Sequence, residues 1–179
     1  MKNKSYKSVS ESNVTISELM LPSHSNFSGK IHGGYILSLL DQIAFACASK
    51  HSRAYCVTAS VDTVDFLNPI EVGELVTMRA SVNYVGKSSM VVGIRVEAEN
   101  IQTGKIKHCN SSYFTMVAKN NDGKSIPVPG LILKTKLEIM RFLRAIKRAE
   151  VKRIKKQDFL YDEKKHLEIL KNYNIKIEL

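Results

Sequence analysis

The 179-residue chain has few of the features that mark secreted, membrane-spanning or metal-binding proteins. Its three cysteines, Cys47, Cys56 and Cys109, are an odd number without CxxC spacing, so we expect reduced, buried thiols and no disulfide framework or zinc site. The purely apolar runs are only a few residues long, whereas a membrane span needs about 20 apolar residues. Residues 1–12 are polar and dotted with lysine, with no apolar stretch behind them. We therefore expect no secretory signal and a cytoplasmic protein.

Several enzyme motifs are also missing. The chain contains neither GxxxxGK[ST] nor GxGxxG, so nucleotide-binding loops of those types have no support. A triad of Ser38, His32 and Asp41 could be assembled, but the GxSxG nucleophile elbow is absent. The spacing of His32, Asp41 and His51 is not the i, i+4 spacing of helical metal ligands. We therefore expect no metal site.

The composition is that of an ordinary globular protein with a strong positive charge. Hydrophobic residues make up 44% and charged residues 25% of the chain. The net charge of +10 alone would suggest a nucleic acid or an anionic membrane as partner. However, residues 1–130 hold 13 basic and 10 acidic side chains, whereas residues 131–179 hold 14 and 7. Because most of the excess lies in the last quarter, we do not expect it to define the chemistry.

Prolines and a glycine at residues 126–130 divide the chain. We expect a globular domain over residues 8–124, a linker over residues 125–132 and a basic tail over residues 133–179. Apolar side chains with helical spacing predict that the tail is an amphipathic helix: Leu133, Leu137, Met140, Leu143 and Ile146. Such a helix would dock on the domain or a neighbouring subunit, which we favour, or contact an anionic membrane surface peripherally.

Within the domain, the hydrophobic pattern changes from helical to extended. Residues 33–51 lack proline and are apolar on nearly every face, which predicts one long, buried, central helix. A first strand is expected at residues 14–21. After the helix, runs rich in β-branched residues predict four antiparallel strands joined by turns, at residues 57–64, 75–85, 90–99 and 107–118. The fold class is therefore α+β, with a curved sheet able to wrap around the helix.

A carboxylate in the middle of the predicted helix is the most informative position. Asp41 follows Leu40 and precedes Ile43, and desolvation among such neighbours would make its carboxylate more basic. The alternative is that Asp41 lies on a narrow solvent-facing stripe with Ser38 and Gln42. Periodicity alone leaves both interpretations open.

Two glycines begin the same helix. Gly33 and Gly34 allow a ligand to approach the backbone closely, and the N–H groups of a first helical turn are unpaired donors. Such donors suit an oxyanion or a phosphate. Packing of the helix start against a strand would also require small residues. Helical spacing puts Gly34 and Asp41 on one face, ~10 Å apart along the helix.

These residues belong to a run that resembles a known family. The run NFSGKIHGGYIL at residues 26–37, followed by Leu40, Asp41 and Ala44, resembles the acyl-CoA thioesterases of the hotdog superfamily. More narrowly, it is similar to the cytosolic long-chain acyl-CoA hydrolase group and its bacterial relatives. Three further stretches agree: residues 57–62, 65–69 and 86–90. The resemblance covers about residues 8–120 and does not include residues 131–179.

The resemblance implies a fold, an assembly and a reaction. The hotdog fold is an antiparallel sheet wrapped around one long helix, and its dimers often assemble in threes into a hexamer with active sites between protomers. By similarity, Asp41 is the catalytic carboxylate and Asn26 comes from the facing subunit, while the N–H of Gly33 or Gly34 polarises the thioester carbonyl. The expected reaction is hydrolysis of acyl-CoA to free fatty acid and CoA, with Asp41 as general base or as nucleophile.

No cofactor is expected, because CoA is part of the substrate and the thioester is already an activated acyl group. Lys87 and Ser88, in a hairpin turn, are the candidates for contact with the CoA phosphates, with charge as the only argument. No specific nucleic acid is expected as a partner.

Two other functions stay open from the sequence. Some hotdog domains are non-catalytic acyl-CoA sensors, for which the basic tail would supply a nucleic-acid- or membrane-binding element. The tail nevertheless lacks a helix-turn-helix pattern. A hotdog hydratase or dehydratase would use a histidine, such as His32, with an acidic partner.

Overall fold

The computed structural model describes residues 5–62 and 64–158. Within this range the chain divides into one compact unit that ends at Ala145 and a second that begins at Ile146. The first unit contains every strand and positions the candidate site. The predicted tail extends beyond the described residues, so its part at residues 159–179 lies outside them.

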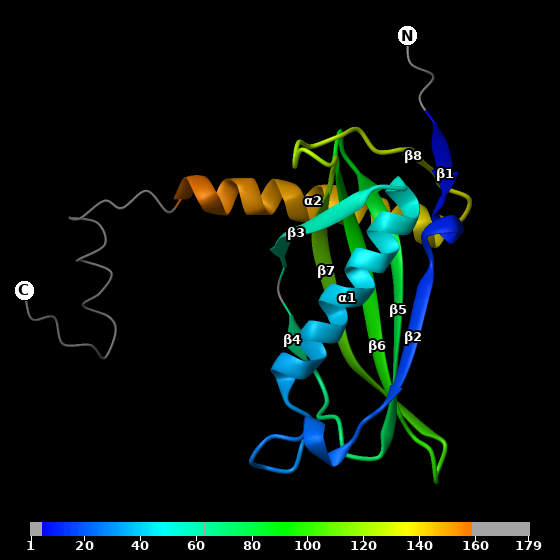
Figure 1. Cartoon of the computed structure of the whole chain (residues 1–179), viewed down its shortest axis with the longest axis vertical. Coiled ribbons are helices and arrows are strands. Elements are labelled where there is room, and N and C mark those ends of the chain that lie inside the picture. Colours follow the sequence, from blue (N-terminus) through cyan, green and yellow to red (C-terminus); the bar gives the residue numbers. More distant parts are fainter. Residues whose placement is uncertain (1–4, 63, 159–179) are drawn as a thin grey trace, which may run out of the picture. The chain divides into compact units, whose positions relative to one another are not determined.

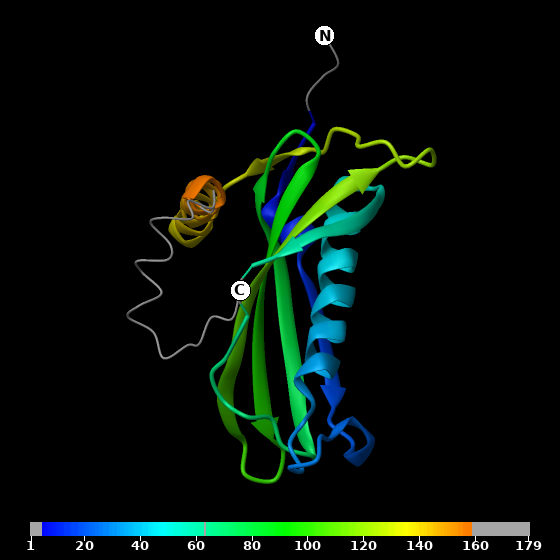
Figure 2. The same ribbon diagram turned by 90° about the vertical axis from the view of Figure 1, so that its left-hand side faces the viewer.

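One long helix lies along a curled antiparallel sheet (Figures 1 and 2). The helix is α1 (Gly33–Ser52), and the sheet has the order β2-β5-β6-β7-β3, with β4 paired to β7. The strands are β2 (Val14–Leu19), β3 (Tyr55–Val61), β4 (Asp65–Phe66), β5 (Glu74–Val85), β6 (Ser89–Asn100) and β7 (Lys105–Lys119). Short 3-10 helices, Val9–Ser12 and Pro22–His24, flank β2. The predicted α+β architecture is confirmed.

The core lies between α1 and the inner face of the sheet. Alternate residues of β5, including Val76, Met78 and Val82, are fully buried on that face. Leu40 and Ile43 are fully buried on the helix. The period of two along the strand and the apolar character of the helix therefore produce one continuous hydrophobic cluster. This cluster also includes buried residues of β6 and β7.

Both ends of α1 are capped by polar groups. At its start, the side chain of His32 accepts a hydrogen bond from the Gly34 N–H. At its end, Arg53 adopts the left-handed conformation with φ of 57°. Lys7 donates from Nζ to the His51 carbonyl at 2.6 Å, which satisfies one of the orphan carbonyls of the last turn.

The segment predicted as a linker contains a strand. Within residues 125–132, β8 (Gly130–Ile132) pairs in parallel with β1 (Tyr6–Ser8) to form a separate two-stranded sheet. A second helix, α2 (Lys136–Asp158), follows and crosses the boundary between the two units. Its first turns, up to Ala145, lie on the opposite face of the sheet from α1 (Figure 2). None of the helices in the described ranges is both long and apolar enough to cross a membrane.

Candidate active site

The carboxylate singled out on the long helix is held by a hydroxyl from the sheet. Thr58 of β3 donates from Oγ1 to Asp41 Oδ1 at 2.5 Å. The sheet register shifts between Thr58 and Ser60, and such an irregularity changes the direction in which neighbouring side chains point. The second carboxylate oxygen, Oδ2, has no hydrogen-bond donor within the described residues. One oxygen is thus fixed and the other is available to a substrate or a water molecule.

Asp41 lies on the exposed stripe that was the second interpretation of the sequence. Ser38, Asp41 and Gln42 are all exposed in the single chain, and Gln42 Nε2 lies 3.4 Å from Ser38 Oγ. Of the two interpretations that the sequence left open, the structure therefore favours the solvent-facing stripe. The apolar residues that surround Asp41 in sequence, such as Leu40 and Ile43, turn inward instead.

An open groove runs beside Asp41, between α1 and β3. Its lining combines polar side chains with apolar and aromatic ones: Asp41, Gln42, Phe45, Tyr55, Cys56, Val57 and Thr58. The rings of Phe45 and Tyr55 meet edge to face with centroids 5.7 Å apart, and both side chains are exposed. Because β3 ends the strand order of the sheet, one side of this groove is an edge that a further strand can cover.

At the start of α1, the two glycines differ in hydrogen bonding. The Gly34 N–H donates to Nδ1 of His32 at 2.9 Å and is therefore occupied. The Gly33 N–H has no acceptor among the described residues. A side chain at Gly33 would meet the ring of Phe66, with a Cβ 3.4 Å from Cζ, so the glycine brings that ring close to the helix start. Of the two predicted donors, Gly33 is the one that is free.

Asn26 organises its own loop. Its Oδ1 accepts hydrogen bonds from Ser28 N at 2.9 Å, Ser28 Oγ at 2.7 Å and Lys30 N at 3.2 Å. Its Nδ2 has no acceptor in the part of the chain that the structure describes, and no hydrogen bond joins Asn26 to Asp41. The single chain therefore does not bring these two predicted site residues together.

Lys87 and Ser88 lie in the turn between β5 and β6 and do not line the groove at Asp41. Their carbonyls accept hydrogen bonds from Val128 N at 3.1 Å and Ala118 N at 3.0 Å. These bonds tie the turn to the rest of the domain, and a contact with CoA phosphates stays a prediction.

Thr58 is the site residue that sequence reasoning missed. It lies in a strand rich in threonine and serine, where one more hydroxyl does not stand out. The available signal was its position inside residues 57–62, one of the stretches on which the family resemblance depends.

Comparison with known proteins places these features in a family context. Residues 28–105 match a family model described as the thioesterase superfamily. Protein VdlD of Helicobacter pylori is 47% identical over 139 residues, which are 78% of this chain and 79% of that protein. An uncharacterized acyl-CoA thioester hydrolase of Bacillus subtilis, YkhA, is 37% identical over 147 residues, 82% of this chain and 86% of that protein. A cytosolic acyl coenzyme A thioester hydrolase of Rattus norvegicus is 33% identical over 136 residues, 75% of this chain and 36% of that protein.

Solved structures of acyl-CoA thioesterases are also similar to this chain. A hexameric apo acyl-CoA thioesterase superimposes with a TM-score of 0.83 at 35% identity, covering 88% of this chain and 99% of the other. The acyl-CoA hydrolase of Staphylococcus aureus, solved with butyryl coenzyme A and coenzyme A, has a TM-score of 0.79 at 32% identity, covering 93% and 99%. Alanine variants of an asparagine, an aspartate and a threonine of that hydrolase have also been solved.

Proposed function

The chain belongs to the thioesterase superfamily, and from that premise we propose that it hydrolyses acyl-CoA to a free fatty acid and CoA. The observation that carries the proposal is the exposed Asp41 carboxylate, which Thr58 holds at the edge of an apolar groove. A thioester is already an activated acyl group, so the reaction needs a positioned base and an oxyanion donor rather than a cofactor.

In the proposed mechanism, Asp41 is the general base. Its Oδ2 takes a proton from water, and the resulting hydroxide attacks the thioester carbonyl carbon. The Gly33 N–H, which has no acceptor among the described residues, donates to the developing oxyanion. Collapse of the tetrahedral intermediate breaks the C–S bond, and the proton that Asp41 took from water passes to the departing CoA thiolate. Direct attack by Asp41 would instead give a mixed anhydride. Attack of labelled water on its aspartyl carbonyl would then place ¹⁸O in the Asp41 carboxylate in a single turnover.

We propose that a neighbouring copy completes the site with its Asn26. Within one chain the Oδ1 of Asn26 is fully engaged in the loop, whereas its Nδ2 can donate to a water or a carbonyl across an interface. The edge strand β3 lies beside the groove and is available to pair with a second copy. A hexameric structural neighbour supports a trimer of dimers as the assembly.

The apolar lining of the groove is suited to the acyl chain. Phe45 and Tyr55 expose aromatic surface next to the reacting carboxylate, where a second subunit would cover it. Burial of an acyl chain there would contribute roughly 0.8 kcal/mol per methylene group. The proposed location of the protein remains the cytoplasm, in line with the name of its rat relative.

Thiol release from acetyl-, octanoyl- and palmitoyl-CoA by the full chain tests this function. Asp41→Asn keeps the shape of the side chain but removes the base, and we expect kcat to fall by about 10²- to 10⁴-fold. Asp122→Asn, in an exposed turn after β7, is the matched control and should leave the activity unchanged. Wild-type activity in the Asp41 variant would overturn the assignment of the base. If the wild type releases no thiol but still binds acyl-CoA, the sensor function replaces the enzyme.

A further inference from the structure

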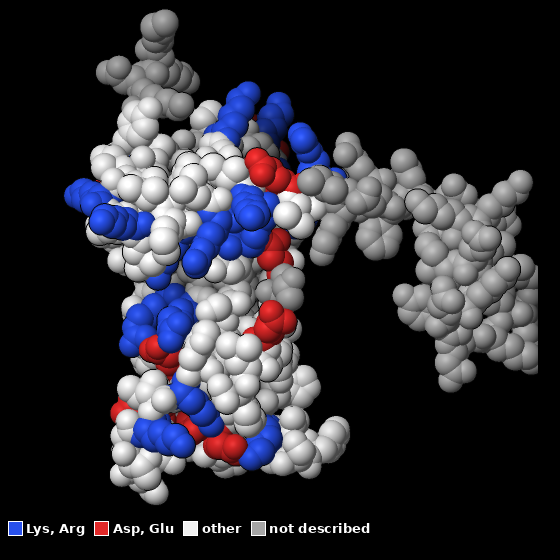
Figure 3. Space-filling model, turned by 180° about the vertical axis from the view of Figure 1, so that it is seen from behind, with Lys and Arg blue, Asp and Glu red and all other residues white. Residues whose placement is uncertain are grey.

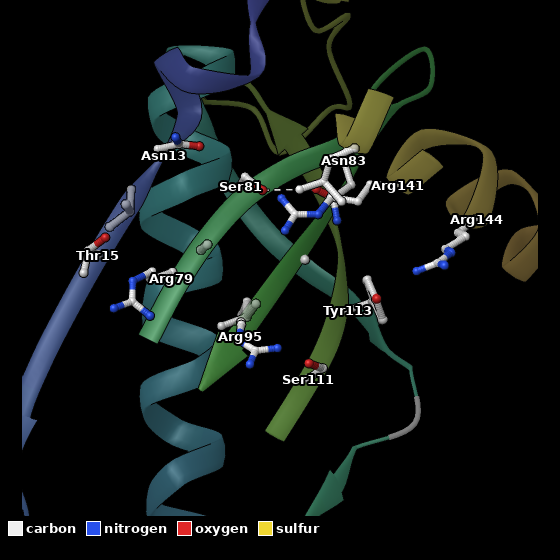
Figure 4. Close-up of a pocket in the computed structure, with 15 residues that line it drawn as sticks. Asn13, Thr15, Arg79, Ser81, Asn83, Arg95, Ser111, Tyr113, Arg141 and Arg144 are labelled. Carbon is white, nitrogen blue, oxygen red and sulfur yellow. Dashed lines mark hydrogen bonds between the residues drawn. The ribbon is translucent and has the colours of Figure 1, made fainter. Parts of the chain in front are cut away.

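A second cavity lies on the face of the sheet turned away from α1. It has a volume of about 450 Å³ and is formed by β2, β5, β6, β7 and the first turns of α2, all within the first compact unit (Figure 4). It shares no lining residue with the groove at Asp41. Its size falls within the range of small-molecule sites. The proposed thioesterase mechanism makes no use of it.

Four arginines surround this cavity and come from three different elements. They are Arg79 of β5, Arg95 of β6, and Arg141 and Arg144 of α2 (Figure 4). No acidic side chain is among the lining residues. Figure 3, which views the molecule from behind, shows basic side chains gathered over the upper part of this face. The cavity is therefore strongly electropositive.

The two sheet arginines are held in place by one carboxylate. Arg79 and Arg95 lie opposite each other in the β5–β6 pairing. Glu97 accepts from Arg95 Nε at 2.8 Å and also from Arg79, and these hydrogen bonds lower the pKa of the Glu97 carboxyl. Two positive charges thus share one negative charge, which leaves a net positive charge in a fixed position beside the cavity.

The two helix arginines have no such compensation. Arg141 and Arg144 form no ion pair within the described residues. Their helical turn is fixed to the sheet because the rings of Phe142 and Tyr84 meet at 5.1 Å and Ala145 is buried. Their guanidinium groups are consequently held near the cavity, where they can serve as donors to a ligand.

A buried amide completes the floor of the cavity. Asn83 is 5% exposed, and its Oδ1 accepts a hydrogen bond from the buried Ser81 Oγ at 3.1 Å. Its Nδ2 has no acceptor among the residues that the structure describes. The absence of a side chain at Gly93 makes room for it, because a Cβ there would lie 2.1 Å from Nδ2. Asn83 lines the cavity, and its Nδ2 is not among the fully buried atoms that lack a partner, so this donor is open to an acceptor supplied by a ligand.

We propose that the cavity binds the phosphate group of a small anionic ligand. Guanidinium groups match phosphate oxygens in a fork geometry, and such charge-assisted hydrogen bonds are among the strongest in proteins. Arg141 and Arg144 hold the phosphate, and Asn83 Nδ2 donates a hydrogen bond to one of its oxygens. Arg79 and Arg95 add a positive electrostatic potential beside it. The phosphate comes either from a free phosphorylated metabolite or from the nucleotide end of a CoA ester.

Isothermal titration calorimetry on the full chain tests this site, with inorganic diphosphate and 3′,5′-ADP as separate probes at an ionic strength of about 0.15 M, which screens weak surface binding. Replacing Arg141 and Arg144 by alanine should weaken binding by about tenfold or more. The matched control removes two exposed positive charges from the adjoining segment, as Lys134→Ala with Lys136→Ala, and should keep the wild-type affinity. Circular dichroism checks the fold of both variants, and Arg95→Gln tests the cavity from a different element.

The outcomes separate the two sources of phosphate. Binding of diphosphate identifies a site for free phosphorylated metabolites, whereas binding of 3′,5′-ADP alone identifies the nucleotide end of CoA. Either result supports the proposal when the arginine variants lose binding of the probe and the lysine control keeps it. Equal losses in both pairs, no binding by the wild type, or a change of oligomeric state in place of anion binding would overturn it. Because binding is measured without turnover, these results do not depend on whether the chain hydrolyses acyl-CoA.

Discussion

Removal of the hydroxyl that holds Asp41 tests the active-site geometry without touching the base itself. Thr58→Val keeps the volume and β-branching of the side chain, but it removes the donor that lies 2.5 Å from Asp41 Oδ1. Thr58 is exposed on an edge strand, so we expect the variant to fold normally. The carboxylate would then be free to rotate away from the position in which its second oxygen meets the attacking water.

The expected size of the effect follows from this one hydrogen bond. Hydrogen bonds to charged groups contribute about 1.5–3 kcal/mol, and the exposure of this pair favours the lower end. A loss of ~1.5 kcal/mol in the transition state lowers the rate by about tenfold. Because Thr58 contacts the proposed base and not the proposed substrate, kcat should fall while KM changes little. Thr58→Ser keeps the hydroxyl and should restore most of the rate.

The assay is continuous thiol release from octanoyl-CoA at saturating substrate. Thr77→Val on β5 is the matched control, because it also removes an exposed threonine hydroxyl, one that bonds Ser17 Oγ at 2.9 Å on a strand that does not line the groove. The reasoning is refuted if the Thr58 valine variant has the wild-type kcat, if the serine variant is equally slow, or if the control loses as much.

Three further predictions concern stability and reactivity. Burial raises the pKa of the Cys47 thiol to about 12, and all three cysteines are buried, so a disulfide reagent should label no thiol rapidly until the protein is unfolded. Burial lowers the pKa of His51, which is neutral in the folded chain, so stability should be complete above the unfolded pKa of about 6.5 and should fall as the pH drops below it. A melting-temperature series should show this loss in the wild type and less of it in His51→Gln. Gly93→Ala would place a Cβ 2.1 Å from Asn83 Nδ2 and should lower the unfolding free energy by about 1–3 kcal/mol in urea titrations.

The main elements were predictable because their signals are local. Residues 33–51 are apolar on nearly every face, and the helix observed there spans Gly33–Ser52. Strand β5 (Glu74–Val85) matches the strand predicted at residues 75–85, and buried and less buried positions alternate from Glu74 to Ala80. In contrast, β1 and β8 are each three residues long and depend on pairing with a distant segment. The prolines near β8 favour a linker locally, and only the tertiary pairing makes a strand there.

The candidate site shows the same limit in finer detail. Asp41 was predictable because a carboxylate in an apolar helix is unusual by residue type alone. The role of Thr58 depends on where β3 passes α1 and on a register shift, neither of which a linear pattern records. Likewise, which of Gly33 and Gly34 keeps a free N–H depends on the orientation of the His32 ring. Residue types therefore point to the candidate residues, whereas the packing of the elements decides which of their atoms are available to a substrate.

The arginine cavity depends on a single irregularity in the β5–β6 hairpin. Next to the turn, Val85 pairs with Met90, and continuing that register would place Arg79 opposite Val96, with Arg95 on the other face of the sheet. The register instead shifts by one residue between Val82 and Tyr84, so that Arg79 faces Arg95 across the two strands. The residue at that shift is the buried Asn83 of the cavity floor. One bulge thus aims the amide into the cavity and also brings the second sheet arginine to the same face. Deleting Asn83 would leave Arg79 opposite Arg95 but remove the amide, so calorimetry should show weaker anion binding with all four arginines retained.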